Sequence, residues 1–240
     1  MFDNRTYRSQ ARKEGLVPFT VTVKETNLHI QAERELSGKA VKAVLECRNL
    51  LESYISRCPE FAWAMTPVQP VFPTPKIAAE MIQAAARSKV GPMAAVAGAV
   101  SEFTGRALLD HSREVIVENG GDIFMKLETE AVFAIFAGNS PLSMKTGVRI
   151  ARRETPFALC TSSGTLGHSA SFGRADAATV VSDSCALADA AATALGNMVT
   201  ETSDIETAME TGRNIQGVQG IIIIKGKKIG LWGDLELVKL

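Results

Sequence analysis

Residues 188–195 of the chain read Ala188-Asp189-Ala190-Ala191-Ala192-Thr193-Ala194-Leu195. They lie within a predicted helix over about 184–198, where small side chains allow close approach of a packed element or a ligand. Asp189 and Thr193 are four residues apart, so both project from one face of this helix. One carboxylate and one hydroxyl among alanines suit a hard cation such as Mg²⁺, which prefers oxygen ligands. The alternative is that both side chains only meet solvent, and the sequence leaves the two interpretations open.

The segments around this helix show strand and helix patterns. The chain after it predicts a helix opened by the capping-box pattern Ser203-x-x-Glu206 and ending near 213, then strands at Ile221–Ile224, Ile229–Trp232 and Leu235–Val238, with a tight turn at Gly226-Lys227. The chain before it predicts strands near 113–118, 123–128, 131–137, 147–151, 156–161 and 177–181.

The N-terminal part of the chain combines one hairpin with several helices. The predicted elements are a β-hairpin over 19–33, a helix capped by Ser37 and ending near 56, an extended proline-rich segment over 66–75, a helix over 76–88 with Thr74 as its N-cap, and a helix over 93–110. Because the strands come in hairpin-like groups, parallel winding is disfavoured. We therefore predict one α+β domain over residues 1–240, with antiparallel or mixed sheets flanked by helices.

The charge balance excludes some classes of partner. The 240 residues include 26 Lys and Arg and 26 Asp and Glu, so the formal net charge is zero. Broad binders of nucleic acid or anionic membranes need an excess of positive charge. A compact anion or metal site is compatible with this balance, and so is a homo-oligomer. The N-terminus has no apolar signal region and no run reaches the roughly 18 apolar residues of a membrane span, so we expect a cytoplasmic protein.

The cysteines do not form a zinc-binding pattern. None is spaced as C-x-x-C, and the three histidines are scattered. We expect Cys47, Cys160 and Cys185 to be small buried apolar side chains.

A second motif, Glu118-Asn119-Gly120-Gly121-Asp122, lies between two predicted strands. Glycines adopt positive φ and expose backbone N–H groups, so Asn119 and Asp122 beside them could help to hold a polar ligand. The alternative, which the local pattern favours, is a type I′ hairpin turn, for which Asn-Gly is a preferred pair.

A third motif follows the strand that ends at Cys160 and reads Thr161-Ser162-Ser163-Gly164-Thr165-Leu166-Gly167-His168. Hydroxyls and glycines after a strand suit an anion-binding loop, although a plain solvated loop has the same composition. No Walker lysine and no G-x-S-x-G motif occur here, so a serine hydrolase has little support. His168 is a candidate general base.

In this order the three motifs resemble those of the ApbE superfamily, the flavin (FMN) transferases. That superfamily has a GGD segment, a Thr-Ser-Gly loop followed by a histidine, and an A-D-A-x-x-T-A-L helix. The resemblance covers about 91–200, including the Gly/Ala-rich segment Gly91–Gly98, and marks this part as the motif-bearing core. Residues in the hairpin and helix region over 1–66 resemble an uncharacterised protein family related to ApbE; they are Tyr7-Arg8, Glu25-Thr26-Asn27-Leu28, Arg48, Tyr54-Ile55 and Pro59-Glu60-Phe61.

The resemblance implies a function and a cofactor set. ApbE enzymes bind FAD and Mg²⁺ and move FMN onto a hydroxyl of a target protein. By resemblance Asp189 and Thr193 would bind Mg²⁺ together with a carbonyl near Ala95–Ala97. Departures accompany the match, because the Gly/Ala segment lacks the family's lysine and no Asp-Pro follows His168.

The expected function is therefore binding of a small phosphate-containing ligand of flavin or nucleotide type, such as FAD or FMN, with Mg²⁺-dependent transferase activity. In this prediction, Gly120, Gly121 and the loop from Ser162 to Thr165 bind the anion, and His168 moves a proton. The alternatives are a non-catalytic metabolite-binding protein and an oligomeric scaffold that retains only the fold.

Overall fold

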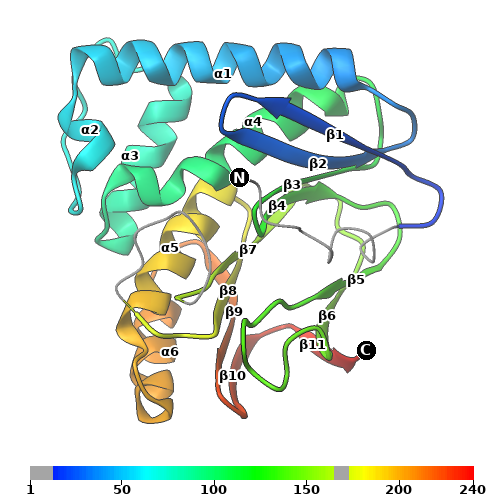
Figure 1. Cartoon of the computed structure of the whole chain (residues 1–240), viewed down its shortest axis with the longest axis vertical. Helices are drawn as coiled ribbons and strands as arrows, with labels where there is room; N and C mark the ends of the chain where they lie inside the picture. The colour runs from blue at the N-terminus through cyan, green and yellow to red at the C-terminus, as the bar shows by residue number, and fades with distance from the viewer. Residues whose placement is uncertain (1–12, 165–172) are drawn as a thin grey trace.

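The computed structural model describes residues 13–164 and 173–240, and the predicted site residues Thr165 and His168 lie outside these residues. An eight-stranded sheet lies at the centre of the described fold (Figure 1). Helices cover one face of this sheet, and a three-stranded sheet covers the other. The predicted α+β class with antiparallel sheets flanked by helices is confirmed.

The large sheet is built entirely from antiparallel pairs among the described strands. Its order is β1-β2-β3-β4-β7-β8-β9-β10. The strands are β1 Val17–Val23, β2 Thr26–Ala32, β3 Val115–Asn119, β4 Asp122–Lys126, β7 Phe157–Ser162, β8 Ala177–Ser182, β9 Val218–Lys225 and β10 Lys228–Gly233. Helices lie between β2 and β3 and between β8 and β9 in the chain. Strands that are distant in sequence are therefore neighbours in this sheet.

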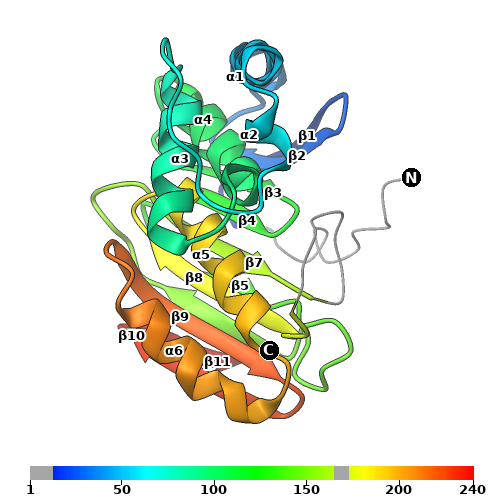
Figure 2. The same cartoon turned by 90° about the vertical axis from the view of Figure 1, so that its left-hand side faces the viewer.

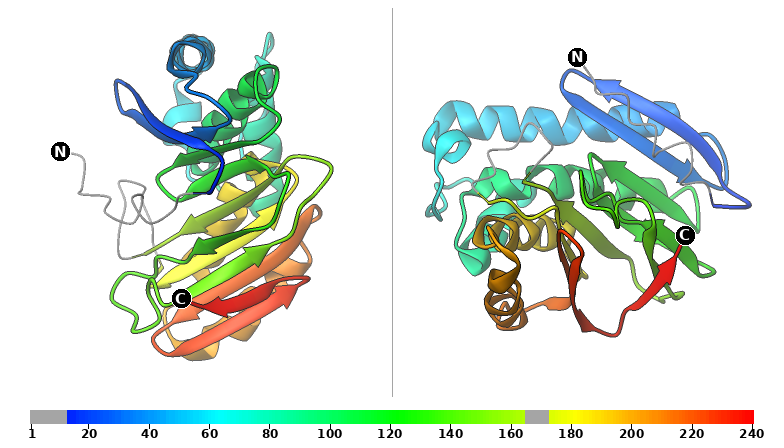
Figure 3. Two further views of the ribbon diagram at one scale, coloured as in Figure 1. Left: turned by 90° about the vertical axis from the view of Figure 1, so that its right-hand side faces the viewer. Right: turned by 60° about the horizontal axis from the view of Figure 1, so that its bottom comes forward.

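The small sheet consists of β5 Ala131–Ala134, β6 Thr146–Ile150 and β11 Glu236–Lys239, in the order β11-β6-β5. Figure 3 shows it lying over one face of the large sheet. Its apolar side chains Phe133 and Val148 belong to the same buried cluster as Met125 and Phe157 of the large sheet. Burial of these apolar side chains between the two sheets stabilises the packing of the small sheet on the large one.

The helices are α1 Ser37–Arg57, α2 Glu60–Trp63, α3 Lys76–Ser88, α4 Val96–Leu109, α5 Cys185–Met198 and α6 Ile205–Arg213, with 3-10 turns η2 Pro92–Ala95 and η3 Thr202–Asp204. Figure 2 shows α5 and α6 lying on the face of the large sheet opposite the small sheet. Among the described residues, no helix has the length and apolar character needed to cross a membrane.

The run Ile221–Ile224 of β9 contributes side chains to both buried clusters of the fold. Ile221 and Ile223 belong to the cluster under the helices, whereas Ile222 and Ile224 belong to the cluster under the small sheet. Side chains alternate between the two faces of a strand, so four consecutive isoleucines are all buried only where both faces are covered.

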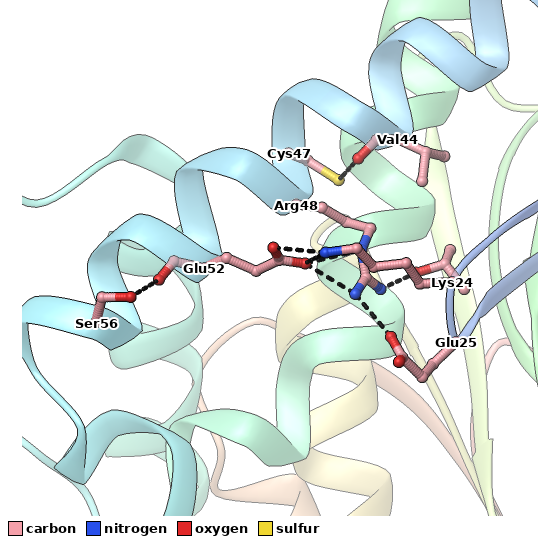
Figure 4. Close-up of polar contacts among 8 residues, drawn as sticks. Lys24, Glu25, Val44, Cys47, Arg48, Glu52 and Ser56 are labelled. Atoms are coloured by element: carbon pink, nitrogen blue, oxygen red, sulfur yellow. Dashed lines mark hydrogen bonds and ion pairs between the residues drawn. The ribbon is translucent and has the colours of Figure 1, made fainter.

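The N-terminal helix α1 is held on the first hairpin by a group of ion pairs (Figure 4). Arg48 donates to Glu52 at 2.9 Å, to Glu25 at 2.7 Å and to the Thr26 hydroxyl at 2.9 Å. Lys24 pairs with Glu52 at 2.9 Å. Arg48, Glu25 and Thr26 are among the residues that carry the family resemblance, and these contacts give them a role in docking α1.

Several predicted helix caps differ from the structure, although the bounds predicted for α3, 76–88, are confirmed. Ser37 is already the first residue of α1, after Leu36, and Pro75 rather than Thr74 precedes α3. The capping box is formed by Glu201 and Asp204, so the prediction from Ser203-x-x-Glu206 was wrong. The helix predicted over 93–110 is split into η2 and α4. Cap motifs are short and recur by chance, so they locate a helix better than they locate its first residue.

Candidate functional site

The candidate site is centred on the contact between α4 and α5. The backbone N–H of Gly98 donates to Oδ2 of Asp189 at 2.8 Å. At the start of α5, the N–H of Cys185 donates to Oε2 of Glu102 at 2.7 Å. Each helix therefore places a carboxylate at the N-terminus of the other, where free N–H groups and the helix dipole stabilise negative charge.

The Gly120-Gly121 turn lies against the beginning of α4. Both glycines have positive φ, +69° and +112°, and they join β3 to β4, so the hairpin-turn interpretation is correct. The two central residues are the glycines rather than Asn-Gly. Asn119 Nδ2 donates to the carbonyl of Ala97 at 3.2 Å, and the N–H of Gly121 donates to Glu118 at 3.2 Å.

The surroundings of this turn are acidic. Glu118, Asp122 and Asp189 are all buried. Burial raises the pKa of Asp189 from 3.8 to about 7, against the lowering effect of the N–H groups of Gly98 and Ala97. Burial, followed by the negative charge of Asp189, raises the pKa of Asp122 well above its usual range. This pair of buried acidic side chains makes the turn a poor place for an anion.

One atom of this cluster has no partner. Oδ1 of Asp122 is buried and has no hydrogen bond within the described part of the chain. A buried, unsatisfied carboxylate oxygen beside a second buried carboxylate is costly, and a cation would relieve that cost. The donors here are carboxylate and carbonyl oxygens, which fit Mg²⁺ better than zinc. No group of three or more His, Cys, Asp or Glu among the described residues is arranged to hold a metal, so water or a ligand would have to complete the coordination.

The end of β7 brings the third motif to the same turn. The N–H of Thr161 donates to the carbonyl of Gly121 at 3.2 Å, and its hydroxyl is bonded to that of Thr179 at 2.9 Å. Gly164 is tied to Ala175 by a backbone hydrogen bond of 3.0 Å. The loop therefore starts beside the acidic cluster, and the predicted residues Thr165 and His168 lie outside the described residues.

Two thiols lie beneath the cluster. Cys160 and Cys185 are fully buried free cysteines whose sulfur atoms are 3.5 Å apart. Burial raises the pKa of both, to about 11 for Cys185, so both thiols stay protonated and unreactive at neutral pH. The predicted burial of Cys47, Cys160 and Cys185 is confirmed.

A cavity of about 890 Å³ lies beside Thr193. Its lining comes from α2 and the segment after it, the C-terminal parts of α3, α5 and α6 with the residues that follow α3 and α6, η2, and the start of α4. The lining residues are Ala62, Ala64, Met65, Arg87, Ser88, Lys89, Val90, Gly91, Met93, Ala94, Val96, Thr193, Ala194, Asn197, Met198, Thr211, Asn214 and Ile215. Its size suits a small organic ligand.

Among the predicted site residues that the structure describes, only Thr193 lines this cavity. Asp189 lies one helical turn away on the same helix face, toward the acidic cluster. The end of α3, where Arg87, Ser88 and Lys89 line the cavity, was not predicted as part of a site. The only sequence signal there is the pair of basic residues Arg87 and Lys89 before Val90-Gly91-Pro92, and this pattern is typical of an ordinary helix end.

The arrangement of sheets and helices is that of the ApbE proteins. The chain aligns with a structure described as the flavin transferase ApbE from Vibrio cholerae, with a TM-score of 0.56, 13% identity and coverage of 90% of this chain and 96% of that one. The flavinyl transferase ApbE of Pseudomonas stutzeri aligns with a TM-score of 0.58 and 13% identity over 90% of this chain and 94% of that one. At this identity the likeness establishes the fold.

The sequence defines the family within that fold. A family model described as AbpE bacteria matches residues 8–231, and the chain belongs to this family. Its relatives include a UPF0280 protein of Methanococcus aeolicus, 35% identical over 91% of both chains. A UPF0280 protein of Methanosarcina acetivorans is 37% identical over 90% of this chain and 86% of its own length. The predicted membership in a family related to ApbE is confirmed.

Proposed function

We propose that this protein binds a small phosphate-containing ligand of flavin or nucleotide type, with Mg²⁺ held beside α5. One observation carries the proposal: Thr193 borders the cavity, and one turn earlier on α5 lies the buried carboxylate of Asp189, close to Asp122, whose Oδ1 has no hydrogen bond among the described residues. Asp189 and Thr193 would hold the ion, with the carbonyl of Ala97 nearby. When bound, Mg²⁺ would neutralise and polarise the phosphate groups of the ligand.

The chain's own residues would position that ligand. Thr193 would orient the phosphate end through its hydroxyl, while Met93, Val96 and Met198 would exclude water from the apolar part. The N–H group of Gly98 would fix the direction of the Asp189 carboxylate. His168 would be the candidate for proton transfer. Transferase activity is the finer part of this proposal, and it draws on the named activity of the structural neighbours.

A non-catalytic metabolite-binding protein is the second candidate. Asp189 already caps α4 and Glu118 already accepts the amide of Gly121, so both side chains have structural roles without a ligand. In this case the same cavity would bind the ligand and release it unchanged.

The test measures binding and turnover separately. Melting temperature is followed with FAD, FMN and ATP, each with and without Mg²⁺, and AMP release from FAD is measured. A ligand at about 100 times its Kd should add roughly 2.7 kcal/mol to the free energy of unfolding. Thr193→Val, which keeps the side-chain shape, and Asp189→Ala should lose the Mg²⁺-dependent part of this gain.

Asp110→Ala is the matched control, because Asp110 is an exposed acid at the end of α4. No Mg²⁺-dependent stabilisation of the unaltered protein by any of the three ligands would refute the proposal. Stabilisation without AMP release would favour the metabolite-binding protein over the transferase.

A further inference from the structure

The cavity beside Thr193 has a charge bias that the chain as a whole lacks. Arg87 and Lys89 line it, and no acidic residue lines it within the described part of the chain. The whole sequence has equal numbers of basic and acidic residues, 26 of each. Arg87 and Lys89 are exposed side chains at the border of this cavity, and their two positive charges would attract an anion into it.

These two cations are not used elsewhere in the described structure. Neither Arg87 nor Lys89 forms an ion pair with a described residue. Some other basic side chains form ion pairs, as Arg48 does with Glu25 and Glu52. The guanidinium of Arg87 and the ammonium of Lys89 therefore keep their donors available for a phosphate oxygen.

The residue between them supplies a further donor. Ser88 lines the cavity and is only 6% exposed, and its Oγ has no hydrogen-bond partner among the described residues. A buried hydroxyl without a partner costs free energy. Rotation about its Cα–Cβ bond would let it donate to a group bound in the cavity.

Lys89 has an unusual backbone conformation. Its φ is +58°, at the position directly after α3 where glycine is preferred, and its N–H donates to the carbonyl of Ala85. A non-glycine residue there costs about 1 kcal/mol. The chain thus places a lysine where glycine would be more stable, and this lysine lies at the cavity.

We propose that Arg87, Ser88 and Lys89 form an anion subsite at the end of α3 that binds the phosphate or pyrophosphate of the ligand. This inference rests on the proposed function and deepens it, since it specifies that the ligand is a phosphate ester whose charge is bound by α3. The η2 and α4 residues that line the cavity, Met93, Ala94 and Val96, offer no cation. Among the described residues that line this cavity, those at the end of α3 supply its positive charge.

The test uses Arg87→Gln combined with Lys89→Gly. Glycine suits the positive φ, so this change removes a charge without disturbing the backbone. The matched control is Lys227→Gln with Lys228→Gln, which removes two charges from the exposed turn between β9 and β10. Kd is measured by calorimetry for FAD with Mg²⁺, ADP, inorganic pyrophosphate, riboflavin and adenosine.

We expect the α3 variant to bind FAD, ADP and pyrophosphate at least about tenfold more weakly, with changes under about twofold for riboflavin and adenosine. The control variant should match the unaltered protein. Equal weakening by the control, or unchanged binding of all phosphate-bearing ligands, would overturn the subsite. If pyrophosphate binds through α3 but FAD with Mg²⁺ gives no signal, the subsite stands and the proposed flavin-type ligand does not.

Discussion

Asp189 illustrates how one residue can serve two roles. Its Oδ2 accepts the N–H of Gly98 at 2.8 Å and so caps α4. Its carboxylate also lies within the influence of Asp122, whose pKa it raises. A cap alone would be equally well made by an uncharged acceptor, so the buried charge indicates a demand beyond capping. The proposed cation would meet that demand.

The stability of the metal-free protein should therefore depend on pH. The pKa of Asp189 is raised from 3.8 to about 7 in the folded state, so the folded protein keeps a proton that the unfolded chain releases. The associated stability is complete below pH 3.8 and is lost as pH rises through about 7. We expect the free energy of unfolding, measured by urea titration with a chelator present, to fall over this range.

Asp189→Asn provides the comparison. Asparagine still accepts the N–H of Gly98 but does not titrate, so the fall with pH should be smaller than in the unaltered protein. Mg²⁺ added at pH 8 should restore stability to the unaltered protein and not to the variant. Identical pH profiles for the two proteins would contradict the assignment.

At the scale of elements, the close packing of α4 on α5 aligns the candidate site. A Cβ built on Gly98 would lie 2.3 Å from the carbonyl oxygen of Cys185 and 2.8 Å from Cβ of Asp189. The reciprocal carboxylate caps from Glu102 and Asp189 depend on the same spacing. The small residues of both helices thus serve helix packing and bring Asp189 to the turn at Gly120-Gly121.

Gly98→Ala should separate the two helices. We expect a loss of about 2–3 kcal/mol in the free energy of unfolding, because a backbone carbonyl blocks the added methyl group. Gly38→Ala in α1 is the control, since nothing lies within 4 Å of a Cβ there. That change should stabilise by about 0.5–1 kcal/mol. Chemical denaturation measures both, and equal effects would contradict the packing argument.

At the scale of the whole molecule, both faces of the large sheet are covered. The helices bury one face and the small sheet buries the other, and β9 contributes isoleucines to each cluster. The fold therefore has two apolar interiors separated by a single sheet.

Shortening a buried isoleucine on either face of the large sheet should lower the free energy of unfolding by a similar amount. Ile222→Ala and Ile223→Ala, both fully buried on opposite faces, should each lower the free energy of unfolding by about 2–5 kcal/mol. Ile229→Ala in β10, where the side chain is 36% exposed, should cost much less. Urea denaturation of the three variants tests this. A small effect for Ile222→Ala would mean that the small sheet does not exclude water from the face of the large sheet that it covers.

Much of the fold was predictable because its signals are local. Alternation in 19–33 and the pair Asn119-Gly120 predict hairpins, and four consecutive isoleucines predict a strand. The start of each helix was less predictable, as Ser203 and Glu206 illustrate, because a cap depends on which donors the folded chain leaves free. The motifs placed Asp189 and Thr193 on one helix face.

The sequence by itself determined the α+β class, the order of the elements, membership in the family related to ApbE and the helix that carries the candidate metal ligands. Only the tertiary structure brought Asp189 to Gly98, which is 91 positions away in the chain, and formed a cavity lined in part by α3 and α5. Periodicity and motif spacing act over a few residues, so they specify elements and faces. A cavity and its charge depend on side chains from distant segments, and packing of the helices on the sheet brings those segments together.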